Sequence, residues 1–212
     1  MNARNNAAAW DERFSGEVYA YGKDPNVWLT ERIRLIQVPT ENSALFPADG
    51  EGRNAVWAAT KGWNSHVFDL SEQGRRKCEL LAREHDVNVE YDVDDLVKRE
   101  FEHQSFDLIA CSWFHTPSEV RSIHMPRMLH ALKVGGNFIM EGYHTSQLPL
   151  SSGGPKSLDL LFDLDTVVEE LTSHLAPQME IVYAKVESTE LDESDLHRGH
   201  AKVVRIQLKR MS

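Results

Sequence analysis

The chain has 212 residues, of which 41% are hydrophobic and 26% charged, so we expect one folded domain, or two small ones, with a substantial core. No apolar run approaches the roughly 20 residues of a membrane-spanning helix, and the first residues lack the basic start and apolar stretch of a secretion signal. The two cysteines, Cys78 and Cys111, do not form a C-x-x-C pair. This composition excludes a disulfide scaffold or a cysteine-built zinc site and predicts a cytoplasmic location.

The charge balance argues against a nucleic-acid partner. Lysine and arginine number 23 against 33 acidic residues, which gives a net charge of −10. An acidic surface repels phosphate backbones, and the basic cluster Arg75-Arg76-Lys77 is more typical of a solvated helix face than of a binding patch. We therefore expect neither a nucleic-acid nor a membrane partner.

The first forty residues mix aromatic and polar side chains, and we treat residues 1–40 as an N-terminal helical segment. A helix is predicted at about residues 26–36, and Pro39 then breaks the chain. Beyond this point short apolar runs alternate with helical patterns. The runs predict strands at residues 43–48, 65–70, 87–91, 106–111 and 137–143.

Helical patterns separate these strands. Residues 54–61 predict a helix that Gly62 ends, and Ser71 is placed to cap the next helix. Residues 120–132 predict a third helix that bends at Pro126. This alternation is typical of an α/β fold, a Rossmann-like, doubly wound and mostly parallel sheet with helices on both faces.

The end of the chain breaks this alternation. Asp165 is placed to cap a helix that stops before Pro177, and two strand-like runs follow at residues 180–186 and 201–208. The polar, acidic stretch 187–200 between them has no helical periodicity, so no crossover helix joins the two runs. Because parallel pairing needs a crossover, we predict a seven-stranded sheet whose last strand is antiparallel. This ending differs from that of an ordinary dinucleotide dehydrogenase.

A glycine-containing loop follows the first predicted strand. Gly50 and Gly52 stand between that strand and the next helix, where glycine lets a backbone approach a ligand and the helix start offers free N–H groups. The third glycine of a dinucleotide motif is absent, because Ala55 takes its place. By itself the loop is therefore open to two interpretations, a ligand loop or an ordinary turn.

Carboxylates follow the second and third strands. Asp69 ends the second strand, where a carboxylate is placed to accept both hydroxyls of a ribose. The alternative, a helix cap, is already supplied by Ser71. Asp95, after the third strand, is a candidate for the amine of an adenine, with Leu96 packing on the ring, although a solvated acidic loop is equally compatible with the sequence.

The order of these motifs resembles a class I S-adenosylmethionine-dependent methyltransferase. The motifs are Gly50-Glu51-Gly52-Arg53-Asn54, Asp69-Leu70-Ser71, Asp95-Leu96, Phe106-Asp107-Leu108-Ile109 and Leu132-Lys133-Val134-Gly135-Gly136. Finer features resemble the bacterial branch that includes tellurite-resistance methyltransferases and, more distantly, thiopurine methyltransferases. They are Trp10-Asp11-Glu12-Arg13-Phe14, Tyr21-Gly22 with Pro25-Asn26, His115-Thr116-Pro117 with Arg121, and Gly153-Gly154-Pro155-Lys156. The resemblance spans about residues 10–209.

This resemblance implies a helical lid at residues 1–40, a methyltransferase domain at residues 41–212, and S-adenosylmethionine as the cofactor. It implies a small-molecule acceptor, such as a chalcogen oxyanion (tellurite or selenite) or a thiol, and a monomer or homodimer. The cofactor-binding residues that we expect are Tyr21, Asp49, Gly50, Gly52, Asn54, Asp69, Leu70, Asp95, Leu96 and Cys111.

One departure from the family pattern affects the glycine loop. The family has an acidic residue at the end of the first strand and then a first glycine, but this chain has Phe46 and Ala48 there. Asp49 either compensates for the missing acid or the site is weakened. A cofactor-binding regulator without catalysis is therefore the alternative function. A nicotinamide oxidoreductase is disfavoured by the missing third glycine and the antiparallel last strand.

Candidates for contact with the acceptor lie on loops after the strands, where open α/β sheets bind ligands. We expect His115, Tyr143 and Arg121 to be the catalytic or substrate-contacting residues, with Arg121 able to pair with an anionic acceptor. For each histidine a surface or packing role is the alternative. The other candidates are Trp113, His144, Gln147, His197 and His200.

Two further features are open to more than one interpretation. The pair His197-x-x-His200 has no accompanying acidic or cysteine motif, so we predict no metal site. Trp10, Tyr19 and Tyr21 either shield the sulfonium of the cofactor as part of a lid or are core residues of the N-terminal helices.

Overall fold

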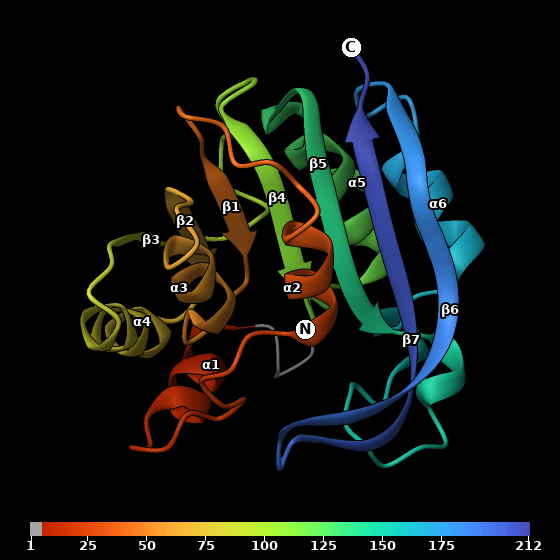
Figure 1. Ribbon diagram of the computed structural model, residues 1–212. Helices are drawn as coiled ribbons and strands as arrows, with labels where there is room; N and C mark the ends of the chain where they lie inside the picture. Colours follow the sequence, from red (N-terminus) through yellow and green to blue (C-terminus); the bar gives the residue numbers. More distant parts are fainter. Residues whose placement is uncertain (1–5) are drawn as a thin grey trace.

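Seven strands form one sheet in the computed structural model, which describes residues 6–212 (Figure 1). Their order across the sheet is β3-β2-β1-β4-β5-β7-β6, with β1 to β5 parallel and β7 antiparallel to both of its neighbours. This arrangement confirms the predicted fold class and the antiparallel ending. The strands are β1 Ala44–Pro47, β2 Ser65–Asp69, β3 Val89–Val93, β4 Phe106–Ser112, β5 Leu132–Tyr143, β6 Met179–Ser194 and β7 His197–Arg210.

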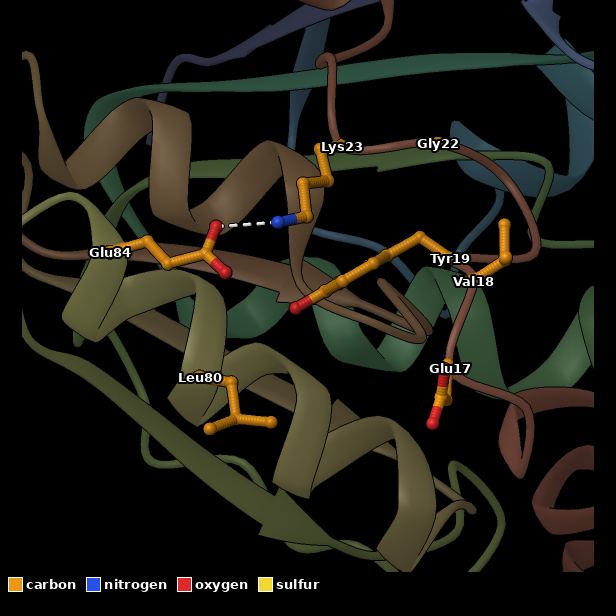
Figure 2. A pocket seen from close by; sticks show the side chains of 7 residues that line it. All are labelled: Glu17, Val18, Tyr19, Gly22, Lys23, Leu80 and Glu84. Carbon is orange, nitrogen blue, oxygen red and sulfur yellow. Dashed lines mark hydrogen bonds and ion pairs between the residues drawn. The ribbon is translucent and has the colours of Figure 1, made fainter.

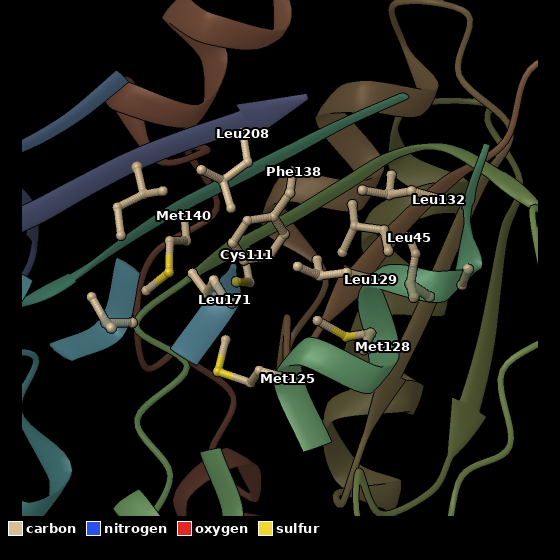
Figure 3. Packing of buried hydrophobic residues seen from close by; sticks show 14 of the residues in the cluster. Leu45, Cys111, Met125, Met128, Leu129, Leu132, Phe138, Met140, Leu171 and Leu208 are labelled. Atoms are coloured by element: carbon tan, nitrogen blue, oxygen red, sulfur yellow. The ribbon is translucent and has the colours of Figure 1, made fainter. Parts of the chain in front are cut away.

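Helices pack on both faces of the sheet because successive strand residues point to opposite sides. In β1, Phe46 packs with the cluster that includes residues of α2 and α3, whereas Leu45 packs with the cluster under α5 and α6. Figure 3 shows this second cluster, in which Met125 and Met128 of α5 meet side chains of the sheet. The helices are α1 Ala7–Phe14, α2 Val27–Ile33, α3 Arg53–Ala59, α4 Glu72–Glu84, α5 Ser118–Met128 and α6 Leu164–Leu171.

Helix ends follow local capping chemistry with one correction to the sequence prediction. The Ser71 hydroxyl accepts a hydrogen bond from the Gly74 amide, as expected for the cap of α4. The prediction that Asp165 caps α6 is wrong: the side chain of Asp163 accepts from the Thr166 amide instead. Pro126 lies inside α5 without ending the helix, and a 3-10 turn follows at Leu129–Ala131.

The stretch 187–200 was expected to be an irregular connection between two strands, and it is a hairpin instead. β6 and β7 pair without interruption from Glu187–Val203 to Thr189–Ala201, and their pairing continues to Ser194–His197. Two adjacent polar strands satisfy each other's backbone groups, so such a hairpin does not need a strongly apolar sequence. Its tip lies at the end of the sheet toward which β4 and β5 point, the same end as α1 (Figure 1).

None of the helices among residues 6–212 is long and apolar enough to cross a membrane. The first five residues of the predicted N-terminal segment lie outside the described residues.

Candidate functional site

The loop after β1 turns sharply into α3. Gly50 and Gly52 have φ angles of 55° and 85°, in the left-handed region that glycine adopts readily, and Ala48 has a φ of 52°. A Cβ on Gly52 would lie 2.2 Å from the Sγ atom of Cys78 in α4. The loop therefore needs glycine at this position, both for its backbone angle and for the close approach of α4.

Asp49 organises the start of α3. Its carboxylate accepts hydrogen bonds from the amides of Asn54 (3.1 Å) and Ala55 (2.9 Å) and from the Asn54 side chain (2.5 Å). Burial raises the pKa of this carboxyl to about 6. Phe46, at the position where the family has an acid, is fully buried in the core beside α2 and α3. Asp49 thus caps α3. The position at which the family has an acid is occupied here by Phe46, a residue of the apolar core.

Asp69 joins the loop after β1 to the loop after β2. Its carboxylate accepts from the amides of Gly50 and Ser71, both at 3.0 Å, and burial raises its pKa to about 6. The Asp69 carbonyl also accepts from the Asp94 amide at 2.9 Å, which ties the loop after β2 to the loop after β3. The side chain is 8% exposed, and two oxygens with about four lone-pair sites retain room for further donors.

The groups at this end of the sheet fit S-adenosylmethionine. Asp69 and Leu70 follow β2, and Asp95 and the buried Leu96 follow β3, so the structure brings these four expected residues to one edge of the sheet. A carboxylate suits ribose hydroxyls, a second one suits the adenine amine, and a leucine suits the ring face. Leu96 and Cys111 both belong to the buried cluster under α5, and burial raises the pKa of the Cys111 thiol.

Helix α1 lies over the glycine loop. The Asp11 carboxylate accepts from the Ser71 hydroxyl (2.6 Å) and the Gln73 amide (3.0 Å) at the start of α4. The Phe14 ring contacts Gly50 so closely that a Cβ there would lie 2.9 Å from it, and Trp10 stacks on Phe14 with ring centroids 5.6 Å apart. The N-terminal helix therefore covers the same edge at which Asp69 lies.

His115 and Tyr143, two of the expected acceptor residues, are buried together. His115 donates from Nδ1 to the Leu160 carbonyl (2.6 Å) and accepts at Nε2 from the Tyr143 amide (3.2 Å), and burial lowers its pKa to about 3. The Tyr143 hydroxyl donates to the Ser152 carbonyl at 3.2 Å, and burial raises its pKa. Both nitrogens of a neutral imidazole are thus engaged with this chain.

Arg121 is engaged as well. Its guanidinium donates to both carboxylate oxygens of Glu170 in α6, at 2.7 and 3.1 Å, and lies over the Phe162 ring. Together with His115, which also packs on Phe162, it positions the segment before α6. In the structure, the three expected acceptor residues therefore have intramolecular partners.

A buried network that the sequence did not indicate lies beside them. Glu193, near the hairpin tip, accepts from Arg53 (2.8 Å), the Trp113 indole (2.9 Å), the Asn26 amide (2.8 Å) and His197 (3.3 Å). Burial alone would raise the pKa of Glu193, but the hydrogen bond from His197 and the charge of Arg53 bring it to about 2. No local pattern marks this residue, because Arg53, Trp113 and Asn26 are far away in the sequence.

The other expected acceptor residues lie around this network. Gln147 is buried and binds Ser152 and the Lys202 amide, whereas His144 bonds to Ser146 and His200 pairs with Glu190 on the exposed face of the hairpin. Within residues 6–212, histidine, cysteine and acidic side chains form no group of three or more that could hold a metal ion.

A surface pocket of about 490 Å³ lies apart from this network, between the N-terminal segment and α4 (Figure 2). The Lys23 ammonium pairs with Glu84 across it and lies over the Tyr19 ring. The lining residues are Glu17, Val18, Tyr19, Gly22, Lys23, Leu80 and Glu84. None of the expected cofactor-binding residues contributes to it.

Comparison with known proteins agrees with this geometry. Residues 47–136 match the family model described as a methyltransferase domain. No curated protein is a significant match to the sequence.

Three solved structures illustrate the likeness in fold. The first is a protein described in work on the conversion of a disulfide bond into a thioacetal group during echinomycin biosynthesis. It has a TM-score of 0.73 at 14% identity over 97% of this chain and 90% of its own. A methyltransferase from Methanosarcina mazei has a TM-score of 0.65 at 16% identity, over 89% and 99%. TehB from Haemophilus influenzae has a TM-score of 0.68 at 13% identity, over 96% and 66%.

At such identities the structural likeness shows the fold alone, and the family match is confined to residues 47–136. The matched residues run from the end of β1 to the glycines within β5, and they include the glycine loop, Asp69 and Asp95. Residues 47–136 therefore match a methyltransferase domain, and the chain as a whole has the fold of a solved S-adenosylmethionine-dependent methyltransferase.

Proposed function

We propose that this protein transfers the methyl group of S-adenosylmethionine to a small-molecule soft nucleophile, a thiol or a chalcogen oxyanion. The observation that carries the proposal is the placement of Asp69, which the Gly50 and Ser71 amides hold at the carboxyl end of β2. The likeness to TehB and to a protein associated with disulfide chemistry supports an acceptor of this kind.

The cofactor, when bound, supplies an activated methyl group, so the chain's own residues have to bind, align and exclude water. In this proposal Asp69 binds the ribose, while Asp95 and Leu96 hold the adenine. The N-terminal segment, residues 1–40, acts as a lid whose helix α1 keeps water from the crevice. A soft nucleophile needs little further activation.

A cofactor-binding regulator without catalysis is the second candidate. It is favoured by Phe46, which fills the place of the family's acid with a core side chain, and by Ala48, which has a left-handed backbone without being glycine. Both functions require cofactor binding, and only the enzyme requires turnover.

Calorimetric titration with S-adenosylhomocysteine, with NADH as the comparison ligand, tests the shared requirement. We expect micromolar binding of S-adenosylhomocysteine alone. Asp69→Ala should weaken it by about 10- to 100-fold, because hydrogen bonds to a charged group are lost. Asp92→Ala is the matched control, since Asp92 is an exposed carboxylate at the same sheet edge that pairs with Arg99.

The control should leave the affinity unchanged. A protein that binds neither ligand contradicts the proposal. Binding of S-adenosylhomocysteine without methylation of thiols, selenite or tellurite favours the regulator instead.

A further inference from the structure

The tip of the β6–β7 hairpin reaches the topological switch point of the sheet, where successive strands begin to be added on the other side of β1. In the order β3-β2-β1-β4-β5, this point lies between β1 and β4, and open α/β sheets bind their ligands in the crevice there. Glu193 pairs with Arg53, which follows the β1 loop, and with Trp113, which follows β4. A segment late in the sequence therefore contributes side chains to the place where the reaction would occur.

His197 and Glu193 form a carboxylate–imidazole pair at this point. The Nδ1 atom of His197 lies 3.3 Å from Oε2 of Glu193, and both side chains are more than nine-tenths buried. Because the Glu193 carboxylate is ionised, it is an acceptor only, so Nδ1 carries the proton and Nε2 carries the lone pair. Among residues 6–212, Nε2 has no hydrogen-bond partner, in contrast to both nitrogens of His115.

Aromatic rings surround the imidazole. The ring centroids of Trp113, Tyr21 and Tyr143 lie 4.7, 4.8 and 5.6 Å from that of His197. Gly153 closes the side of the ring that bears Cδ2, since a Cβ there would lie 3.0 Å from that atom. Aromatic walls of this kind suit a sulfur atom and exclude water from a proton acceptor.

Three buried or half-buried arginines around this end of the sheet are paired with carboxylates. Arg53 bonds to Glu193, as described, and Arg205 to Glu141. Arg121 bonds to Glu170, so these cations are already neutralised. Arg13 of α1 is exposed and bonds to the Tyr21 hydroxyl at 3.3 Å. Because the buried cations are neutralised, a neutral acceptor fits the buried surroundings of His197 better than an oxyanion.

The protonation of His197 depends on groups from several elements. Burial lowers its pKa, and the Glu193 carboxylate opposes that effect. The charges of Arg53 in α3 and Arg13 in α1 lower the pKa further, and His115 is a further titratable neighbour. The imidazole is thus neutral at neutral pH and able to accept a proton.

We propose that His197 is the general base of the methyl transfer and that Glu193 is its positioning residue, with a thiol as the acceptor. The inference rests on the proposed function and assigns its acceptor. Nε2 of His197 takes the thiol proton while the sulfur attacks the methyl carbon. The bond from that carbon to the sulfonium breaks, and its electron pair stays on the departing thioether. The imidazolium then releases its proton to water.

Two thiol acceptors that differ in their protonation at neutral pH distinguish a general-base role of His197 from a structural role. A simple alkyl thiol, 2-mercaptoethanol, is largely protonated at neutral pH, since unperturbed thiols have pKa values of about 8.5, whereas 4-nitrothiophenol is ionised. We expect His197→Gln to lower the turnover of 2-mercaptoethanol by about 100-fold or more and that of 4-nitrothiophenol by less than about threefold. Glu193→Gln should show the same split.

His200→Gln is the matched control on the same hairpin, because His200 is exposed and bonds only to Glu190 there. It should leave both turnovers unchanged. All three variants should bind S-adenosylhomocysteine like the unaltered protein, which shows that the fold and the cofactor site persist.

A second measurement is independent of turnover. In the ¹⁵N spectrum of the histidine rings, the signal that disappears in His197→Gln should report a proton on Nδ1 at neutral pH. A proton on Nε2 overturns the inference whatever the activities are. The inference is also overturned if the variants lose equal activity with the two thiols or lose none with either. Methylation of selenite without methylation of 2-mercaptoethanol overturns it as well, but leaves the proposed function standing.

Discussion

Ala48 has a backbone conformation that its side chain disfavours. Its φ of 52° lies in the left-handed region, at the position where the family has the first glycine of the loop. The neighbouring contacts hold it there, because the Ala48 amide donates to the Phe68 carbonyl at 2.8 Å and Asp49 caps α3 immediately afterwards. The loop thus holds a left-handed backbone at a residue other than glycine.

Ala48→Gly should therefore stabilise the protein by about 1 kcal/mol, since glycine adopts a positive φ without steric cost. Urea denaturation measures the change in the free energy of unfolding. Ala59→Gly, at the end of α3, is the control and should destabilise by about 1 kcal/mol, as glycine does in a helix. Equal destabilisation by the two changes would show that Ala48 is not strained.

At the scale of elements, strand β5 and the segment before α6 are packed without spare room. Gly142 in β5 faces the fully buried Phe162 ring, and a Cβ on Gly142 would lie 2.2 Å from Cε2 of that ring. His115 and Arg121 also pack on Phe162, so the ring has no free side into which it could move. The glycine is required here by space and not by its backbone angle.

Gly142→Ala should destabilise the protein by about 1–3 kcal/mol, the usual cost of overpacking a core. Gly16→Ala is the control, because no atom lies within 4 Å of the added Cβ and its φ is not positive. That change should be neutral or slightly stabilising. The two midpoints of urea denaturation provide the comparison, and a neutral Gly142→Ala would contradict the packing argument.

At the scale of the whole molecule, the N-terminal helix α1 is connected to the proposed cofactor site by direct contacts. Helix α1 bonds to the start of α4 through Asp11 and contacts the glycine loop through Phe14. The following residues Ser15–Glu17 are exposed. A helix held at one end by a few contacts and followed by an exposed segment is able to open locally without global unfolding.

If α1 is a lid, S-adenosylhomocysteine should slow hydrogen exchange of its amides by about tenfold or more, because a bound ligand favours the closed state. Helix α6 packs on the opposite face of the sheet and is the internal control, so its exchange should not change. Exchange measured by mass spectrometry with and without the ligand tests this. Equal protection of both helices would indicate general stabilisation and contradict a lid.

Much of the fold follows from local pattern. The five parallel strands alternate with helices whose start and stop signals are short-range, such as the Ser71 cap, so sequence spacing alone predicts them. Helix ends were less accurate, as the choice of Asp163 over Asp165 shows, because two nearby aspartates offer equivalent caps and tertiary packing selects one.

The candidate site residues also fall into two groups, those whose position the sequence predicted and those whose position depends on tertiary packing. That Asp69 and Asp95 lie at the same end of the sheet was predictable, because each stands at or just after the end of a strand and parallel strands end on one side. The locations of Cys111, His115 and Arg121 were not, because burial and pairing depend on which distant segment packs on them.

The sequence by itself thus determined the parallel sheet and its antiparallel ending, since these depend on periodicity, and the class of cofactor followed from its resemblance to a known family. The tertiary structure alone decided that the polar stretch 187–200 is a hairpin and that Glu193 meets Arg53 and His197 at the crevice. Glu193 and Arg53 lie in segments far apart along the chain, and no local propensity encodes a contact that exists only after both segments have folded onto the same edge of the sheet.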